Sequence, residues 1–275
     1  MHSEWSWDAV AGSMLDSCAR AVQLGLPSIA FTEHAEFTRS TIEPHRAALL
    51  SAHFRRHLRP DGVFAPPELD LAGYLDCLEA CRERFPGLRV LTGVELSEPH
   101  WHPERTAALL AAARIDRALG SVHALGGPDA ARPVDMIFPD RPALDVVRDY
   151  LAEVLRLVES PAPFGILAHI DYAVRYWPPA AGPFEPAAVE DELRAVLRAL
   201  ATSGRALEIN TKLPLAPRIV HWWADSGGER VSFGSDAHRP DRVGHGFAAA
   251  ADAAAAAGFR PGRDPVELWW RPVGR

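Results

Sequence analysis

The alternation of two kinds of segment constrains the fold of this chain most. Six short apolar runs rich in β-forming residues are separated by stretches with helical spacing of apolar residues. The stretch 70–85, for example, carries Leu71, Leu75 and Leu78 and ends before a Pro-Gly pair. Strands that alternate with helices indicate parallel β-α units, and hence an α/β fold. The six runs are 27–34, 89–96, 117–123, 164–170, 205–210 and 231–238.

The helices expected between these runs cover most of the remaining chain. The longest segment without a strand is 35–69, where we expect an insertion with one helix around 43–58 and a loop. A chain of 275 residues suits one large domain, so we expect a single domain over 1–275. The other expected helices are 8–25, 70–85, 103–114, 142–159, 186–203, 215–226 and 248–258.

Composition argues against several classes of partner. The formal net charge is −7 and no dense Lys/Arg cluster is present, which disfavours nucleic acid as a partner. No apolar run is long enough to span a bilayer and no secretory leader is visible, so we expect no membrane partner. Three scattered cysteines are not a disulfide framework and fit a cytoplasmic protein. The sequence leaves the oligomeric state open.

Polar side chains follow almost every expected strand at its carboxyl end. In a parallel barrel these ends converge on one face. Histidine and carboxylate without cysteine form a ligand set for Zn²⁺, Mn²⁺ or Fe. Several such residues on separate strands are hard to explain by packing, because buried unpaired polar groups are costly. The residues are His34, Glu95, His123, His169, Glu208, Asn210, Asp236 and His238.

The first residues add two further candidates. His2 and Asp8 lie just before the first expected helix. Asp8 is either the N-cap of that helix, a metal ligand, or both. Glu33 adjoins His34, but alternation along a strand directs it to the opposite face, where we expect it to orient its surroundings.

The ordered set of these residues resembles the PHP family, named for polymerase and histidinol phosphatase domains, and its phosphatase branch in particular. The motifs stand here as "HSEWSWD", "FTEH", "GVE", "GSVH", "AHID" and "GSDAH", between residue 2 and about residue 246. The resemblance implies a distorted (β/α)7 TIM-like barrel with up to three metal ions at its C-terminal face. The family's first motif has a His-x-His pair, of which only the second histidine, His2, is present. We therefore expect a truncated first strand.

The resemblance also implies ligands and roles. One ion would be held by His2, Glu95 and Asp236, and a second by Glu95, His123 and His169. A third would be held by Asp8, His34 and His238. Glu95 would bridge two ions, and Asp236, Glu95 and His238 would be the catalytic residues, with Asp236 able to take a proton from water. The implied cofactor is two or three divalent ions, Zn, Mn or Fe.

Four cations that follow strand ends are candidates to hold a phosphate group. Each is equally open to a role as a solvated surface charge. They are Arg39, Arg175, Lys212 and Arg218.

The activity implied by the resemblance is metal-dependent hydrolysis of a small phosphate ester. The implied substrate is L-histidinol phosphate, and the implied pathway is histidine biosynthesis. One alternative keeps the metal site but acts on another small phosphate ester or a nucleotide. The other alternative is a non-catalytic, degraded barrel, which the missing first histidine keeps open.

Overall fold

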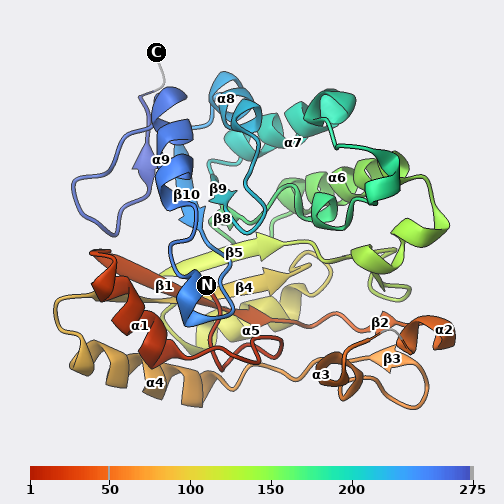
Figure 1. Cartoon of the computed structure of the whole chain (residues 1–275), viewed down its shortest axis with the longest axis horizontal. Coiled ribbons are helices and arrows are strands. Elements are labelled where there is room, and N and C mark those ends of the chain that lie inside the picture. The colour runs from red at the N-terminus through yellow and green to blue at the C-terminus, as the bar shows by residue number, and fades with distance from the viewer. Residues whose placement is uncertain (49, 273–275) are drawn as a thin grey trace.

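The computed structural model describes residues 1–48 and 50–272, and its centre is a curled seven-stranded sheet that forms a half-barrel (Figure 1). The order of strands is β1-β4-β5-β8-β9-β10-β11. Neighbouring strands are parallel from β1 to β10, and β11 is antiparallel to β10. The mixed α/β class predicted from the sequence is therefore confirmed. The strands are β1 (Ser28–Ala35), β4 (Arg89–Ser97), β5 (Arg117–Ser121), β8 (Ile166–Leu167), β9 (Ala206–Asn210), β10 (Arg230–Gly234) and β11 (Trp269–Trp270).

Helices cover the outside of the curl (Figure 1). One group, α1 and α4, packs on β1 and β4, whereas α6 to α9 pack against one another beyond β8, β9 and β10. No helix among the described residues is both long and apolar enough to cross a membrane. The helices are α1 (Met14–Gln23), α4 (Leu71–Arg84), α5 (Pro103–Ala112), α6 (Ala143–Glu159), α7 (Glu190–Thr202), α8 (Pro217–Asp225) and α9 (Phe247–Ala256).

Alternation along the strands decides which side chains face into the curl. Val94 and Leu96 are buried in the core beneath the outer helices, so Glu95 between them faces inward. Phe31 packs in a second core with residues of α1 and α4. His34 therefore points inward, whereas Glu33 points outward, as predicted for that pair.

The register aligns the carboxyl ends of the strands. His34 on β1 is opposite Glu95 on β4, and Ser97 is opposite Ser121 on β5. Because each parallel strand ends at the same edge, side chains from distant parts of the sequence meet there.

The first residues lie between β1 and the segment that follows β10. The Thr32 amide donates to the Met1 carbonyl at 2.8 Å, and the His2 amide donates to the Ala237 carbonyl at 2.8 Å. These contacts place His2 at the carboxyl end of the sheet although no strand is assigned to it. The seventh strand is instead β11, which pairs with β10 at Val231 and Trp269.

Two predicted helices differ in the structure. The helix expected over 8–25 begins only at Met14, because Ser13 caps it by accepting from the Asp16 amide. The single helix expected around 43–58 is wrong. Residues 40–64 instead contain two short strands and two single-turn helices, and Ser51 in an extended conformation begins the second turn. These elements are β2 (Ser40–Thr41), α2 (Pro44–Ala47), α3 (Ala52–Arg55) and β3 (Val63–Phe64).

Candidate metal centre

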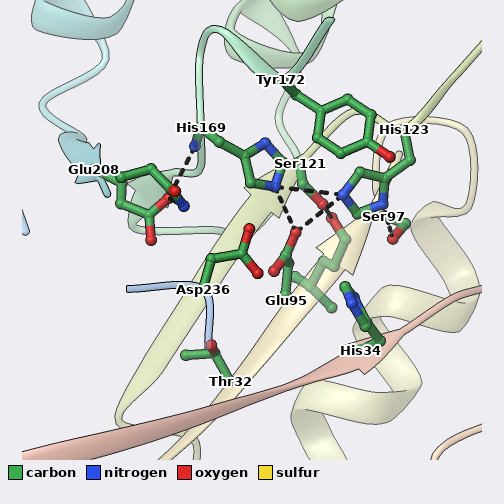
Figure 2. A network of polar contacts seen from close by, with 12 residues as sticks. Thr32, His34, Glu95, Ser97, Ser121, His123, His169, Tyr172, Glu208 and Asp236 are labelled. Atoms are coloured by element: carbon green, nitrogen blue, oxygen red, sulfur yellow. Dashed lines mark hydrogen bonds and ion pairs between the residues drawn. The ribbon is translucent and has the colours of Figure 1, made fainter. Parts of the chain in front are cut away.

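All eight predicted ligands lie in one cluster at the carboxyl end of the sheet. Figure 2 shows five of them converging from β1, β4 and the segments that follow β5, β8 and β10. The remaining three come from the N-terminal loop and from the segment after β10. The cluster comprises His2, Asp8, His34, Glu95, His123, His169, Asp236 and His238.

Glu95 is the centre of the cluster. Its Oε1 lies 2.8 Å from His169 Nε2 and 3.1 Å from His123 Nε2, and its Oε2 lies 3.3 Å from His2 Nε2 (Figure 2 shows the first two contacts). Burial opposes ionisation, but His169, His123 and His2 hold the pKa of this carboxyl well below its usual range. An ionised carboxylate with both oxygens facing imidazoles could take the bridging role that the family resemblance implies for Glu95.

Asp236 lies on the opposite side of His2. Its Oδ1 is 3.3 Å from His2 Nε2 and 3.3 Å from Lys212 Nζ, and its Oδ2 is 2.7 Å from an Arg175 guanidinium nitrogen. Its φ of 46° is in the left-handed region, which is rare for a residue with a Cβ and common at functional sites. The turn after β10 is thus held in the conformation that directs this carboxylate into the cluster.

A third group of ligands surrounds Asp8. Its Oδ2 lies 3.0 Å from His238 Nε2 and 3.4 Å from His34 Nε2. The sequence left Asp8 two roles, N-cap of the first helix and metal ligand. The structure shows that Ser13, and not Asp8, is the N-cap of α1. Asp8 Oδ1 is buried without a hydrogen-bond partner, as expected of an acceptor that has a cation as its partner.

The arrangement fits divalent ions. Ligand atoms of His2, His34 and His238 lie within 4.8 Å of one another, as do those of His34, Glu95 and His123. The His2 and His34 rings are stacked with centroids 4.1 Å apart. Several imidazoles packed against ionised carboxylates match the donor set that suits Zn²⁺, Mn²⁺ or Fe.

Two of the four predicted phosphate-binding cations reach the site. Arg175 and Lys212 line the cavity over the cluster and both contact Asp236. Arg39 and Arg218 are exposed and do not line this cavity. Arg39 directly precedes β2, and Arg218 lies in the first turn of the surface helix α8. For both arginines, the prediction from proximity to a strand end in the sequence was therefore wrong.

The cavity has a volume of about 690 Å³ and its lining is of two chemical kinds. Residues of the metal cluster and the two cations form the charged part of the lining. The apolar part comes mainly from the segment 35–69 and the hairpin that follows β5. Its apolar and aromatic lining includes Ile42, Phe54, Phe64, Pro133, Met136 and Tyr176.

A family model for the PHP domain matches residues 1–212. The chain belongs to the PHP domain family. It is 25% identical over 226 residues to the histidinol-phosphatase of Lactococcus lactis, covering 79% of this chain and 75% of that protein. It is 29% identical over 255 residues to a probable histidinol-phosphatase of Deinococcus radiodurans, covering 86% and 84%.

Solved structures of similar fold agree with this membership. The crystal structure of histidinol phosphate phosphatase from Lactococcus lactis, complexed with zinc, L-histidinol and phosphate, aligns with a TM-score of 0.77 at 23% identity. The alignment covers 94% of this chain and 92% of that one. A putative histidinol phosphatase from Listeria monocytogenes aligns with a TM-score of 0.69 at 16% identity, covering 90% and 97%. The PHP fold is thus shared over nearly the whole chain.

Charges in this PHP site favour bound cations. Burial lowers the pKa of His2 and of His169 to about 4. Burial also opposes the charged form of His34 and His123. Nevertheless Asp8 raises the pKa of His34 to about 9, and Glu36 with Glu95 raises that of His123 to about 10. The carboxylates therefore attract positive charge into the cluster, as protons or as metal ions.

Two carboxylates of the site were not identified from the sequence. Glu36 Oε2 lies 3.7 Å from His123 Nδ1, and Glu98 accepts hydrogen bonds from Thr38 Oγ1 at 2.5 Å and the Ala124 amide at 2.9 Å. Burial and the neighbouring Glu36 raise the pKa of Glu98 to about 7. Their positions gave some indication, since Glu36 follows the predicted ligand His34 by two residues and Glu98 follows Glu95 by three. The backbone turns that direct the two side chains inward could not be predicted from the sequence.

Glu208, noted only as a polar strand end, positions a predicted ligand. Its Oε2 accepts from the His169 amide at 2.9 Å and from Asn210 Nδ2 at 3.0 Å (Figure 2). A Cβ on Gly234 would lie 1.8 Å from Glu208 Oε1, so glycine is needed on the adjacent strand. Glu208 therefore fixes the backbone that carries His169.

Substitution Glu95→Gln tests the central carboxylate. The amide keeps the size of the side chain but removes the charge shared by three imidazoles, so we expect elemental analysis to find fewer ions per chain than in the parent. Glu104→Gln, on the exposed face of α5, is the matched control and should keep the parent's metal content. Unchanged metal content in E95Q would show that Glu95 is not a ligand.

Metal binding should also release protons. In the metal-free protein, His34 and His123 are protonated at neutral pH because their pKa values are raised to about 9 and 10. A ligating imidazole must be neutral, so zinc displaces these protons and its apparent affinity rises as the pH rises from neutral toward those pKa values. Isothermal titration calorimetry in buffers of different ionisation enthalpy counts the protons. A count of zero at neutral pH would contradict this charge assignment.

Proposed function

We propose that the chain is a metal-dependent phosphomonoesterase that hydrolyses L-histidinol phosphate to L-histidinol and phosphate, a step of histidine biosynthesis. One observation carries the proposal. Seven of the eight cluster residues, all but His2, line a single cavity together with two cations, in a PHP chain that has curated relatives named histidinol-phosphatase or probable histidinol-phosphatase.

The proposed cofactor is two or three divalent ions, with zinc as the first candidate. The ligand sets are those implied by the family resemblance, centred on Glu95, on Asp236 and on Asp8. When bound, such ions supply Lewis-acid activation of water and charge stabilisation of the transferred phosphoryl group.

The chain's own cations would hold the phosphate group. The Arg175 guanidinium carries several N–H donors and lines the cavity beside Asp236, so it can donate to a phosphate oxygen. Lys212 adds a mobile ammonium on the same side. Burial opposes ionisation of Asp236, but His2, Lys212 and Arg175 hold its pKa well below the usual range. Asp236 therefore stays ionised, and can orient a water and accept its proton.

The apolar part of the cavity lining suits the histidinol part of the substrate. An imidazole ring packs well against apolar and aromatic side chains such as Phe54 and Tyr176. The substrate's ammonium group needs carboxylates, and Glu36 and Asp135 line the same space. Burial raises the pKa of Asp135, as expected of a carboxyl that lacks a counter-charge until a cation binds.

Other properties stay predictions. We propose that the curled sheet is that of a distorted (β/α)7 barrel and that residues 1–275 form one domain, with 35–69 as an insertion. The cytoplasmic location expected from the cysteines also stays a prediction.

The substrate assignment is tested by phosphate release. We expect the zinc- or manganese-loaded protein to hydrolyse L-histidinol phosphate with a higher kcat/KM than glycerol phosphate or nucleoside monophosphates, and to lose activity with a chelator. We expect this difference in kcat/KM because L-histidinol phosphate can make both the ammonium and the ring contacts described above. A preference for a nucleotide or another ester would keep the metal chemistry and overturn the substrate. No hydrolysis of any ester would leave the non-catalytic alternative.

A matched pair of arginines tests the phosphate end. Removing a charged donor from a developing charge typically costs about 100-fold or more in rate, so we expect such a loss of kcat/KM in Arg175→Ala. Arg218→Ala removes an exposed arginine that the sequence nominated equally, and should behave as the parent. Equal activity of the two variants would exclude Arg175 from phosphate binding.

A further inference from the structure

The hydroxyl of Ser6 connects two ligands to a carboxylate outside the cluster. Ser6 Oγ donates to Glu33 Oε2 at 2.5 Å and accepts from the His34 amide at 3.0 Å. It also lies 3.1 Å from His2 Nδ1. Ser6, Glu33 and His2 are all buried, with at most 4% of any of them exposed, so water does not compete for these contacts.

The capacity of a hydroxyl group decides the direction of the third contact. A hydroxyl has one hydrogen and two lone pairs. The hydrogen is committed to Glu33, and the His34 amide uses one lone pair. The contact with His2 can then form only if Nδ1 of His2 carries the proton and donates it.

This tautomer leaves His2 Nε2 as a lone-pair donor to a metal ion. Nε2 is the atom that faces the cluster, at 3.3 Å from Glu95 and 3.3 Å from Asp236. Without the serine contact, these two carboxylates would favour a proton on Nε2, because each would accept a hydrogen bond from it.

Glu33 determines that Ser6 points its hydrogen away from His2. It accepts from the Ser3 amide at 3.1 and 3.0 Å and from Ser3 Oγ at 2.6 Å, in addition to Ser6. With donors on both oxygens, Glu33 acts as an acceptor, and its place on the outer face of β1 keeps it out of the cluster.

We propose that Glu33 and Ser6 are positioning residues, which hold His2 in the tautomer with Nε2 free to bind a metal ion. Neither binds the ion. The inference rests on the metal centre of the proposed function and is independent of the substrate.

Two serines provide a matched test. Ser3→Ala and Ser6→Ala each remove one buried hydroxyl bond to Glu33, of 2.6 and 2.5 Å, but only the Ser6 hydroxyl also contacts His2 Nδ1 and the His34 amide. Loss of a partner that orients a ligating histidine typically weakens metal binding about 10- to 100-fold. We expect this loss in S6A and in Glu33→Gln, measured by zinc competition with a chromophoric chelator, and an affinity close to the parent's in S3A. Equal zinc affinity in S6A and S3A would overturn the proposal.

The tautomer can be read directly. In the metal-free parent and in S3A at alkaline pH, ¹⁵N chemical shifts should report the Nδ1–H form of His2, whereas S6A should shift toward the Nε2–H form. The measurement on the parent needs no substitution, so the proposal can be refuted even if a variant does not fold. An Nε2–H parent would refute it. A parent that binds zinc but does not hydrolyse histidinol phosphate would overturn the proposed substrate and leave this result standing.

Discussion

The site depends on one buried carboxylate, that of Glu95. Only 4% of its side chain is exposed, so it has lost most of its hydration and needs positive or donor groups on both oxygens to stay ionised. His123, His169 and His2 provide these groups, from the segment after β5, the segment after β8 and the N-terminal loop. The curl of the sheet, the register of its strands and the path of the first residues all serve to bring these histidines to the same carboxylate.

The surroundings of Glu95 show how the cluster balances its charge. Three carboxylates that stay ionised, Asp8, Glu95 and Asp236, lie among five imidazoles, of which His34 and His123 have raised pKa values and His2 and His169 have lowered ones. Of these three carboxylates, only Asp236 has permanent cations beside it among the residues that the structure describes, namely Arg175 and Lys212. The remaining negative charge can be neutralised by metal ions, and an incoming phosphate would compete with Asp236 for the same guanidinium. In the proposed function, substrate binding and the basicity of Asp236 would therefore be coupled through Arg175.

The sequence predicted the parts of the site that strand periodicity controls. His34, Glu95 and His169 follow apolar runs at strand ends, and parallel strands must bring those ends together. Loop conformation was not predictable in this way. Arg39 and Arg175 both follow a strand end, yet only Arg175 reaches the site. It lies in the 3₁₀ turn over Tyr172–Tyr176, which directs its side chain inward. Glu98 itself has a φ of 42°, a left-handed backbone conformation that no local sequence pattern indicates.

The fold shows the same division. The long helices and most of the parallel strands have enough residues for a periodic signal, and the two-residue strand β8 lies within the longer apolar run 164–170. β11 has only two residues, and its partner β10 is nearly forty residues earlier in the sequence, so only tertiary packing reveals it. The helix expected around 43–58 failed for a related reason, since Pro44 and Ser51 each begin a new turn.

The cavity is built from two independent sources, and this has a consequence for how such a protein can change over time. Strand ends and the N-terminal loop provide the reactive cluster, whereas most of the apolar lining comes from segment 35–69 and the hairpin after β5. Surface segments tolerate replacement far better than packed strands do. Substitutions confined to these peripheral segments can therefore change the substrate preference, while the residues of the metal cluster stay the same.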